Sequence, residues 1–130
     1  QGRMWVRDIN KETGSKAKLY PKLRKNSKGI IWNRIENLSS FGTPDLLGYN
    51  TFGTFFTVEL KVTRGNKLKF SPHQIAFHKT HPKNTFIIAE ALGPRSSKHV
   101  HMFRGSRITK LVACGLKLDA CCLGLEACCL

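Results

Sequence analysis

Acidic residues are scarce in this sequence of 130 residues, which has 8 Asp and Glu against 22 Lys and Arg and a formal net charge of +14. Such a charge favours a polyanionic partner, most often nucleic acid, or an anionic membrane surface. Scarcity makes the position of each acid informative. Residues 31–60 hold three acids but only one Lys or Arg, so negative charge is concentrated where core strands are expected.

Long apolar runs are also missing. No run approaches the roughly 20 residues of a membrane-spanning helix, and no signal peptide is visible at the N-terminus. Hydrophobic residues nevertheless make up 41% of the chain, which argues against disorder and suffices for the core of a single domain over residues 1–130. The sequence begins with Gln1, so we interpret residues 1–3 as a tag remnant before Met4.

Cysteine is absent before Cys114, and the odd count of five at one end is a poor disulfide framework. A reducing, cytoplasmic setting is therefore expected. Within residues 116–130, LDACCL repeats as LEACCL seven residues later, which predicts a helical tail with its Cys pairs on one face. Adjacent Cys pairs lack zinc-site spacing, so we interpret them as small hydrophobic residues in a packed or dimer-forming helix.

The clearest strand is FFTVELKV (55–62), in which apolar positions alternate with a set that includes Glu59 and Lys61. The clearest helix is capped by Ser71 and stops at residues 81–82, with Gln74 three residues after the cap. Between residues 50 and 53 we expect a hairpin turn.

Weaker patterns complete the fold. A basic helix is expected over residues 15–26, although Pro21 should break it or mark its first turn. A last helix is expected to be capped by Ser106 and stopped by Gly115. Its apolar face contains Ile108, Leu111 and Val112. Further strands are expected within residues 29–39, 44–50, 85–92 and 98–105. The fold class is therefore α/β, with a mixed central sheet of about five strands flanked by helices.

Two carboxylates are predicted to meet beside a lysine. Asp45 begins the strand before the hairpin and lies 14 residues before Glu59, so the hairpin brings the two acids together. Neighbouring carboxylates repel unless a cation lies between them, and oxygen ligands suit Mg²⁺ or Mn²⁺. Lys61, on the same strand face, is placed to act on a phosphate or an attacking water. The alternative is a structural Glu–Lys pair on a solvated strand.

Three segments, GTPD (42–45), VELK (58–61) and SPHQ (71–74), occur in this order and spacing. Together they resemble the PD-(D/E)xK nuclease superfamily, and more narrowly its VRR-Nuc branch, over about residues 12 to 105. The resemblance implies a restriction-endonuclease-like core. Small stand-alone members, frequent in bacteriophages, resemble Holliday junction resolvases that act as Mg²⁺-dependent homodimers.

The resemblance also implies roles for single residues. Asp45 and Glu59 would bind the metal together with the main-chain carbonyl of Leu60, and Lys61 would be the catalytic lysine. Gln74 would be an accessory group that reaches the site.

Two points stay open in the sequence. Gln74 also completes a Ser-x-x-Gln capping box, so its role is either structural, catalytic or both. Family members usually carry a further glutamate on the first helix, and either Glu12 or Glu36 is a candidate for it.

Basic residues of two segments are expected to contact the DNA backbone. They are Lys16, Lys18, Lys22, Arg24 and Lys25 in the first helix, and Arg64, Lys67 and Lys69 after the central strand. The leading hypothesis is a junction-resolving homodimer that acts on branched DNA, with its interface in residues 98–115 and the tail. The alternative for the tail is that it folds back on its own sheet and covers an edge. The alternatives are a nuclease for flaps, nicks or duplex, and a basic DNA-binding protein without catalysis.

Overall fold

The computed structural model describes residues 16–35, 42–65, 67–92, 99–116 and 128–129. From α2 to α4 the helices and strands follow one another in the order expected from the sequence, and β6 is an additional strand. In chain order they are α2 (Lys16–Lys25), β1 (Ile31–Arg34), β2 (Leu46–Tyr49), β3 (Phe55–Thr63), α3 (Pro72–Thr80), β4 (Thr85–Ala91), β5 (His99–Arg104), the 3-10 helix η1 (Gly105–Arg107), α4 (Ile108–Ala113) and β6 (Cys128–Cys129).

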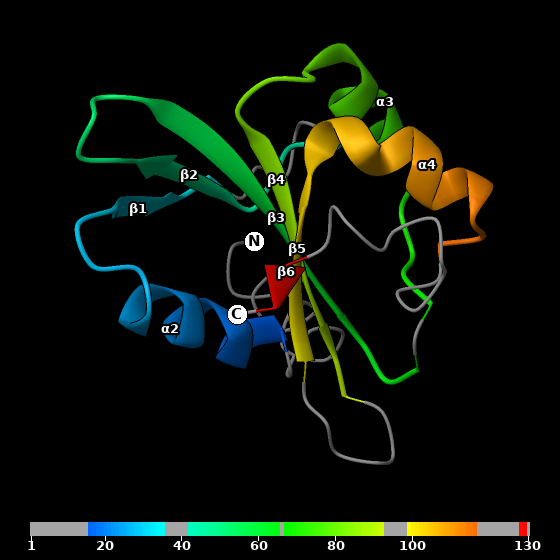
Figure 1. The fold of residues 1–130 in the computed structure, drawn as a ribbon, viewed down its shortest axis with the longest axis horizontal. Coiled ribbons are helices and arrows are strands. Elements are labelled where there is room, and N and C mark those ends of the chain that lie inside the picture. The colour runs from blue at the N-terminus through cyan, green and yellow to red at the C-terminus, as the bar shows by residue number, and fades with distance from the viewer. Residues whose placement is uncertain (1–15, 36–41, 66, 93–98, 117–127, 130) are drawn as a thin grey trace, which may run out of the picture.

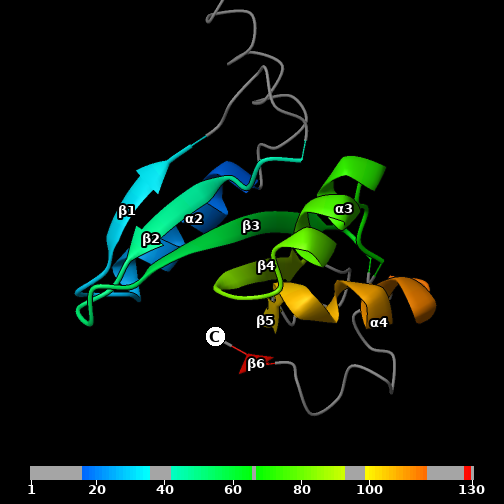
Figure 2. The ribbon, with the colours of Figure 1, turned by 90° about the horizontal axis from the view of Figure 1, so that it is seen from above.

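The strands form one sheet in the order β1-β2-β3-β4-β5-β6. The central pair β3–β4 is parallel and is connected through α3, whereas the other pairs are antiparallel. α2 packs on one face of the sheet, and α3 and α4 lie on the other (Figures 1 and 2). The predicted α/β fold, with a mixed sheet of five main strands flanked by helices, is confirmed.

Alternation along β3 divides the core between the two faces. Val58 and Leu60 pack with Leu19 and Leu23 of α2. The opposite face carries a second cluster, centred on Ile87, which joins β4 and β5 to α4. Because successive strand residues point to opposite faces, Glu59 and Lys61 of β3 face the α3 side.

Pro21 neither ends nor begins the first helix, contrary to expectation, since α2 continues through it. A proline here removes one backbone donor, which would otherwise bond four residues back. The flanking Leu19 and Leu23 are both buried in the core, and this packing offsets the lost bond.

The start of the last helix also differs from the prediction. Ser106 lies inside η1, and Arg107 occupies the N-cap of α4 without a side-chain cap bond. The tight turn reflects Gly105, where an added side-chain carbon would come within 2.1 Å of the Thr85 hydroxyl oxygen. Val112 is 42% exposed, because packing of the short helix is centred on its other apolar residues. Gly115, with φ of +73°, ends the helix as expected.

The prediction of a helical tail is wrong for Cys128 and Cys129, which form β6 beside β5. The two residues pair with β5 and so cover the edge of the sheet, where unpaired backbone N–H and C=O groups would otherwise be exposed. Cys114 is disulfide-bonded, contrary to the expectation that the five cysteines at this end of the chain are a poor disulfide framework. Residues 1–3 and most of the tail lie outside the described residues.

Candidate active site

Asp45 lies across the sheet from Glu59. In the β2–β3 pair Leu46 is opposite Val58, so one step further places Asp45 opposite Glu59. The Asp45 carboxylate accepts a hydrogen bond from the backbone N–H of Leu60, with 2.8 Å between Oδ2 and the nitrogen. The meeting of the two acids that the hairpin predicts is therefore present in the fold.

Glu59 is buried at the centre of the sheet, with only 2% of its surface exposed. Burial of a carboxylate is costly unless charges or hydrogen-bond donors compensate it. One donor is Gln74, whose Nε2 lies 3.4 Å from Glu59 Oε2. The carboxylate thus faces the first turn of α3.

That first turn is a complete capping box. The Ser71 hydroxyl accepts from the Gln74 N–H at 3.2 Å, and Gln74 Oε1 accepts from the Ser71 N–H at 3.0 Å. The same Oε1 accepts from Lys61 Nζ at 2.9 Å. Gln74 therefore joins the helix end to both Glu59 and Lys61, so the structural role and the contact with the site coexist.

Lys61 is held from a second side by Phe70. The Lys61 Nζ lies 4.7 Å from the centre of the Phe70 ring, close enough for a cation–π interaction that stabilises the ammonium in this position. The same ring has buried His78 edge-on to it, with 6.5 Å between the ring centres. Burial lowers the pKa of His78 to about 4, with smaller contributions from the positive charges of Lys61 and His81. His78 is therefore neutral near pH 7 and adds no charge next to the lysine.

Gly42, whose role in the fold the sequence did not reveal, positions the loop that carries Asp45. Its φ is +80°, and an added side-chain carbon would lie 2.5 Å from the backbone oxygen of His73. The loop therefore packs directly on the first turn of α3. A glycine preceding a Pro-Asp pair was the available signal, but the contact with His73 depends on the tertiary fold.

The oxygen atoms gathered here fit a hard divalent cation. Within the described residues no group of three or more His, Cys, Asp or Glu side chains is placed to hold a metal. Asp45 and Glu59 supply two carboxylates, and adjacent carboxylates favour a cation between them. The Leu60 carbonyl faces the same side as its N–H, towards Asp45, because both groups of one strand residue point to one neighbour. Glu12 and Glu36 lie outside the described residues.

The basic residues expected to bind DNA fall into two separate places. α2 packs on the sheet face opposite to Glu59 and Lys61, so its cations are remote from the carboxylates (Figure 1). Lys22 donates to the buried carboxylate of Glu90. Arg64, Lys67 and Lys69 are exposed in the loop that leads from β3 to α3. Only the second group therefore lies next in the sequence to the strand that carries Glu59 and Lys61.

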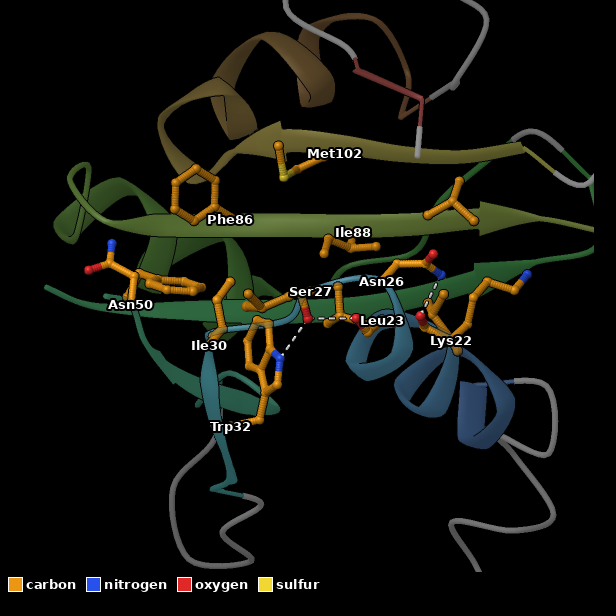
Figure 3. A pocket seen from close by; sticks show the side chains of 14 residues that line it. Lys22, Leu23, Asn26, Ser27, Ile30, Trp32, Asn50, Phe86, Ile88 and Met102 are labelled. Atoms are coloured by element: carbon orange, nitrogen blue, oxygen red, sulfur yellow. Dashed lines mark hydrogen bonds between the residues drawn. The ribbon is translucent and has the colours of Figure 1, made fainter. Parts of the chain in front are cut away.

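The α2 face also contains a cavity of about 520 Å³ (Figure 3). Its lining is mainly apolar and includes Trp32, Phe86 and Met102, with Ser27 accepting a hydrogen bond from the Trp32 indole at 2.9 Å. None of Asp45, Glu59, Lys61 and Gln74 lines it. The cavity and the candidate active site therefore lie on opposite faces of the sheet.

Comparison of the chain with protein families, curated proteins and solved structures found no match. No helix in the described part of the chain has the length and apolar character needed to cross a bilayer.

Proposed function

We propose that this chain is a metal-dependent endodeoxyribonuclease of the PD-(D/E)xK type, related to the VRR-Nuc branch, which hydrolyses phosphodiester bonds. The observation that carries the proposal is that Glu59 and Lys61 meet at Gln74 in the first turn of α3, while Asp45 lies opposite Glu59 on the neighbouring strand. These residues come from three separate segments, so a simple ion pair along one strand does not account for their meeting.

Asp45 and Glu59 would hold Mg²⁺ or Mn²⁺ together with the Leu60 carbonyl. A divalent ion bound there supplies positive charge against a phosphate and lowers the pKa of a bound water. Lys61, oriented by Gln74 and Phe70, would hold its ammonium on the strand face that carries Glu59 and would donate to a phosphate oxygen or an attacking water. The N-terminal end of α3 adds the positive end of a helix dipole, which favours a phosphate.

The substrate that we propose is branched DNA, most specifically the four-way junction. Resolution of a junction needs two symmetric nicks, and each chain holds one Asp45–Glu59–Lys61 set, so the active form would be a homodimer. We propose the cytoplasm of a bacterial cell or of a phage-infected host cell as the place where it acts. The net charge of +14 supports a nucleic-acid partner.

The described contacts divide the expected DNA-binding residues. The exposed loop residues Arg64, Lys67 and Lys69 directly follow the strand that carries Glu59 and Lys61, and charge reversal there should weaken DNA binding and flatten its salt dependence. The same reversals at Lys18 and Lys25 should have a smaller effect, because α2 packs on the opposite face of the sheet. Salt titrations of DNA binding separate the two groups.

The test of the proposal incubates the purified protein and Mg²⁺ with a labelled four-way junction, a flap and a linear duplex of matched sequence. Paired nicks in the junction are expected, and they should disappear in Asp45→Asn and Glu59→Gln while DNA affinity is kept or improved. Glu90→Gln is the matched control, since it removes the same charge from the α2 face. If only the flap or the duplex is cleaved, the proposed substrate is wrong and the proposed reaction, metal-dependent phosphodiester hydrolysis, is kept.

Cleavage that persists in Asp45→Asn and Glu59→Gln would contradict the assignment of the site. DNA binding without any cleavage in Mg²⁺ or Mn²⁺ would favour a basic DNA-binding protein without catalysis. Light scattering without DNA tests the dimer separately. A monomer on and off the junction would favour a flap- or nick-directed nuclease.

A further inference from the structure

The hairpin between β2 and β3 presents an aromatic side chain at its tip. Phe52 is 90% exposed, the highest exposure of any large hydrophobic residue among those that the structure describes. Asn50 braces the turn, because its Oδ1 accepts from the N–H groups of Phe52 and Thr54, each at 3.0 Å. The tip is therefore a defined turn that holds a ring in solvent.

Behind the tip, a row of apolar side chains, two of them exposed, crosses three strands. Ile31, Tyr49 and Phe55 are register partners on β1, β2 and β3. Ile31 is 61% exposed and Phe55 57%, and the rings of Tyr49 and Phe55 lie 4.5 Å apart. Phe55 shares its face of β3 with Glu59, four residues later. The row and the candidate site thus lie on one face of the sheet.

The charge around the hairpin suits a nucleic acid. Residues 46–58 contain no Asp, Glu, Lys or Arg, so nothing acidic on the hairpin itself would repel phosphates. Lysines flank it on both sides. Lys28 precedes Gly29, which lies against the Thr51 side chain, and Lys83 precedes Asn84, whose carbonyl accepts from the Thr57 N–H at 2.9 Å.

We propose that Phe52 stacks on a nucleobase exposed where the arms of branched DNA separate, and that this hairpin selects branched DNA over linear duplex. The inference rests on the proposed nuclease function. An aromatic ring can stack on any base, whereas a continuous duplex presents no free base face. Phe55 and Glu59 are separated by about 13 Å along β3, or about four nucleotides of one DNA strand, so one DNA molecule can contact both.

The other candidate to bind this apolar row is a second copy of the chain. A copy docked on Ile31 and Phe55 would cover the sheet face that leads to Glu59 and would hinder the approach of DNA along it. The uncharged hairpin with flanking lysines fits a DNA strand, in which bases are apolar and phosphates lie to either side. DNA is therefore the occupant that the observations favour.

The test compares the affinities of the protein for a four-way junction and for a linear duplex of equal length, by fluorescence anisotropy without divalent metal. Phe52→Ala should lower the ratio of junction to duplex affinity about tenfold, the size expected for loss of one base–aromatic stack. Phe52→Trp should keep the ratio, because it keeps a stacking ring. Thr54→Ala is the matched control, since it trims another exposed side chain of the same hairpin without removing an aromatic ring.

A ratio within twofold of wild type in Phe52→Ala would overturn the proposal. So would a loss of self-association in Phe52→Ala, measured by light scattering without DNA, because the tip would then belong to a second copy. These readouts need no cleavage. Failure of the nuclease proposal would appear in the Mg²⁺ cleavage test, and failure of the hairpin proposal in the affinity ratio.

Discussion

Gln74 Oε1 accepts a hydrogen bond from Lys61 Nζ at 2.9 Å, and the opposite end of the same amide donates to Glu59 at 3.4 Å. An amide is suited to this position because it offers an acceptor to the ammonium and a donor to the carboxylate. The orientation of the amide is therefore set by the charges on either side of it.

Replacement of Gln74 by Glu separates its two roles. A glutamate can still complete the capping box with Ser71, so the thermal midpoint should stay close to that of wild type. It would also place a second negative charge against Glu59, which should change metal binding and lower the cleavage rate by at least tenfold. Differential scanning calorimetry and cleavage assays check the two parts. A fully active Gln74→Glu would show that the contact with Glu59 is dispensable.

Gly42→Ala should destabilise the loop that carries Asp45. The substitution strains a φ of +80° and drives a methyl group to 2.5 Å from the His73 backbone oxygen. We expect a loss of about 1–3 kcal/mol in the free energy of unfolding and a larger proportional loss of cleavage. Urea denaturation measures the first. Gly65→Ala, where an added carbon meets nothing within 4 Å, is the control.

Lys22→Ala should lower the free energy of unfolding while changing DNA affinity little. Its ammonium pairs with Glu90, which is buried, and removal would leave that carboxylate without this partner. We expect the free energy of unfolding to fall by about 1–3 kcal/mol. Lys25→Ala removes the same charge from an exposed position of α2 and should stay within about 0.5 kcal/mol of wild type. Equal free energies of unfolding for the two variants would contradict a stabilising role of the Lys22–Glu90 pair.

His78 should make the protein less stable in mild acid. Its pKa falls from 6.5 to about 4 on folding, so below pH 6.5 the unfolded chain binds a proton that the folded chain does not. Stability from this group is complete above pH 6.5 and is lost as the pH falls towards 4, by up to about 1.4 kcal/mol per pH unit. Denaturant titrations between pH 7 and 5 measure the slope. His78→Leu should flatten it, and parallel slopes would contradict the assignment to His78.

The sequence predicts β3 and α3 to within a residue at each end, because both depend on short-range signals. Alternation defines β3, and the Ser71–Gln74 box with Pro72 defines the start of α3. The pairing of Asp45 with Glu59 follows from the length of one hairpin. These elements needed no knowledge of how distant parts of the chain pack.

What the sequence does not predict depends on long-range packing. Lys22 and Glu90 are 68 positions apart, and no local pattern indicates that α2 covers the face opposite to the candidate site. The start of α4 was missed for the same reason, since Gly105 fits tightly against Thr85 and forces a 3-10 turn there. Propensity identifies a helix, whereas the neighbouring elements decide where it begins.

The double use of the Gln74 side chain ties local unfolding to the integrity of the site. If the first turn of α3 frays, the hydrogen bonds that hold Lys61 and Glu59 break in the same event. The fraction of molecules with an assembled site is then the fraction with a closed helix end. Hydrogen exchange at the Ser71 and Gln74 amides would therefore report this fraction directly, without substrate or metal.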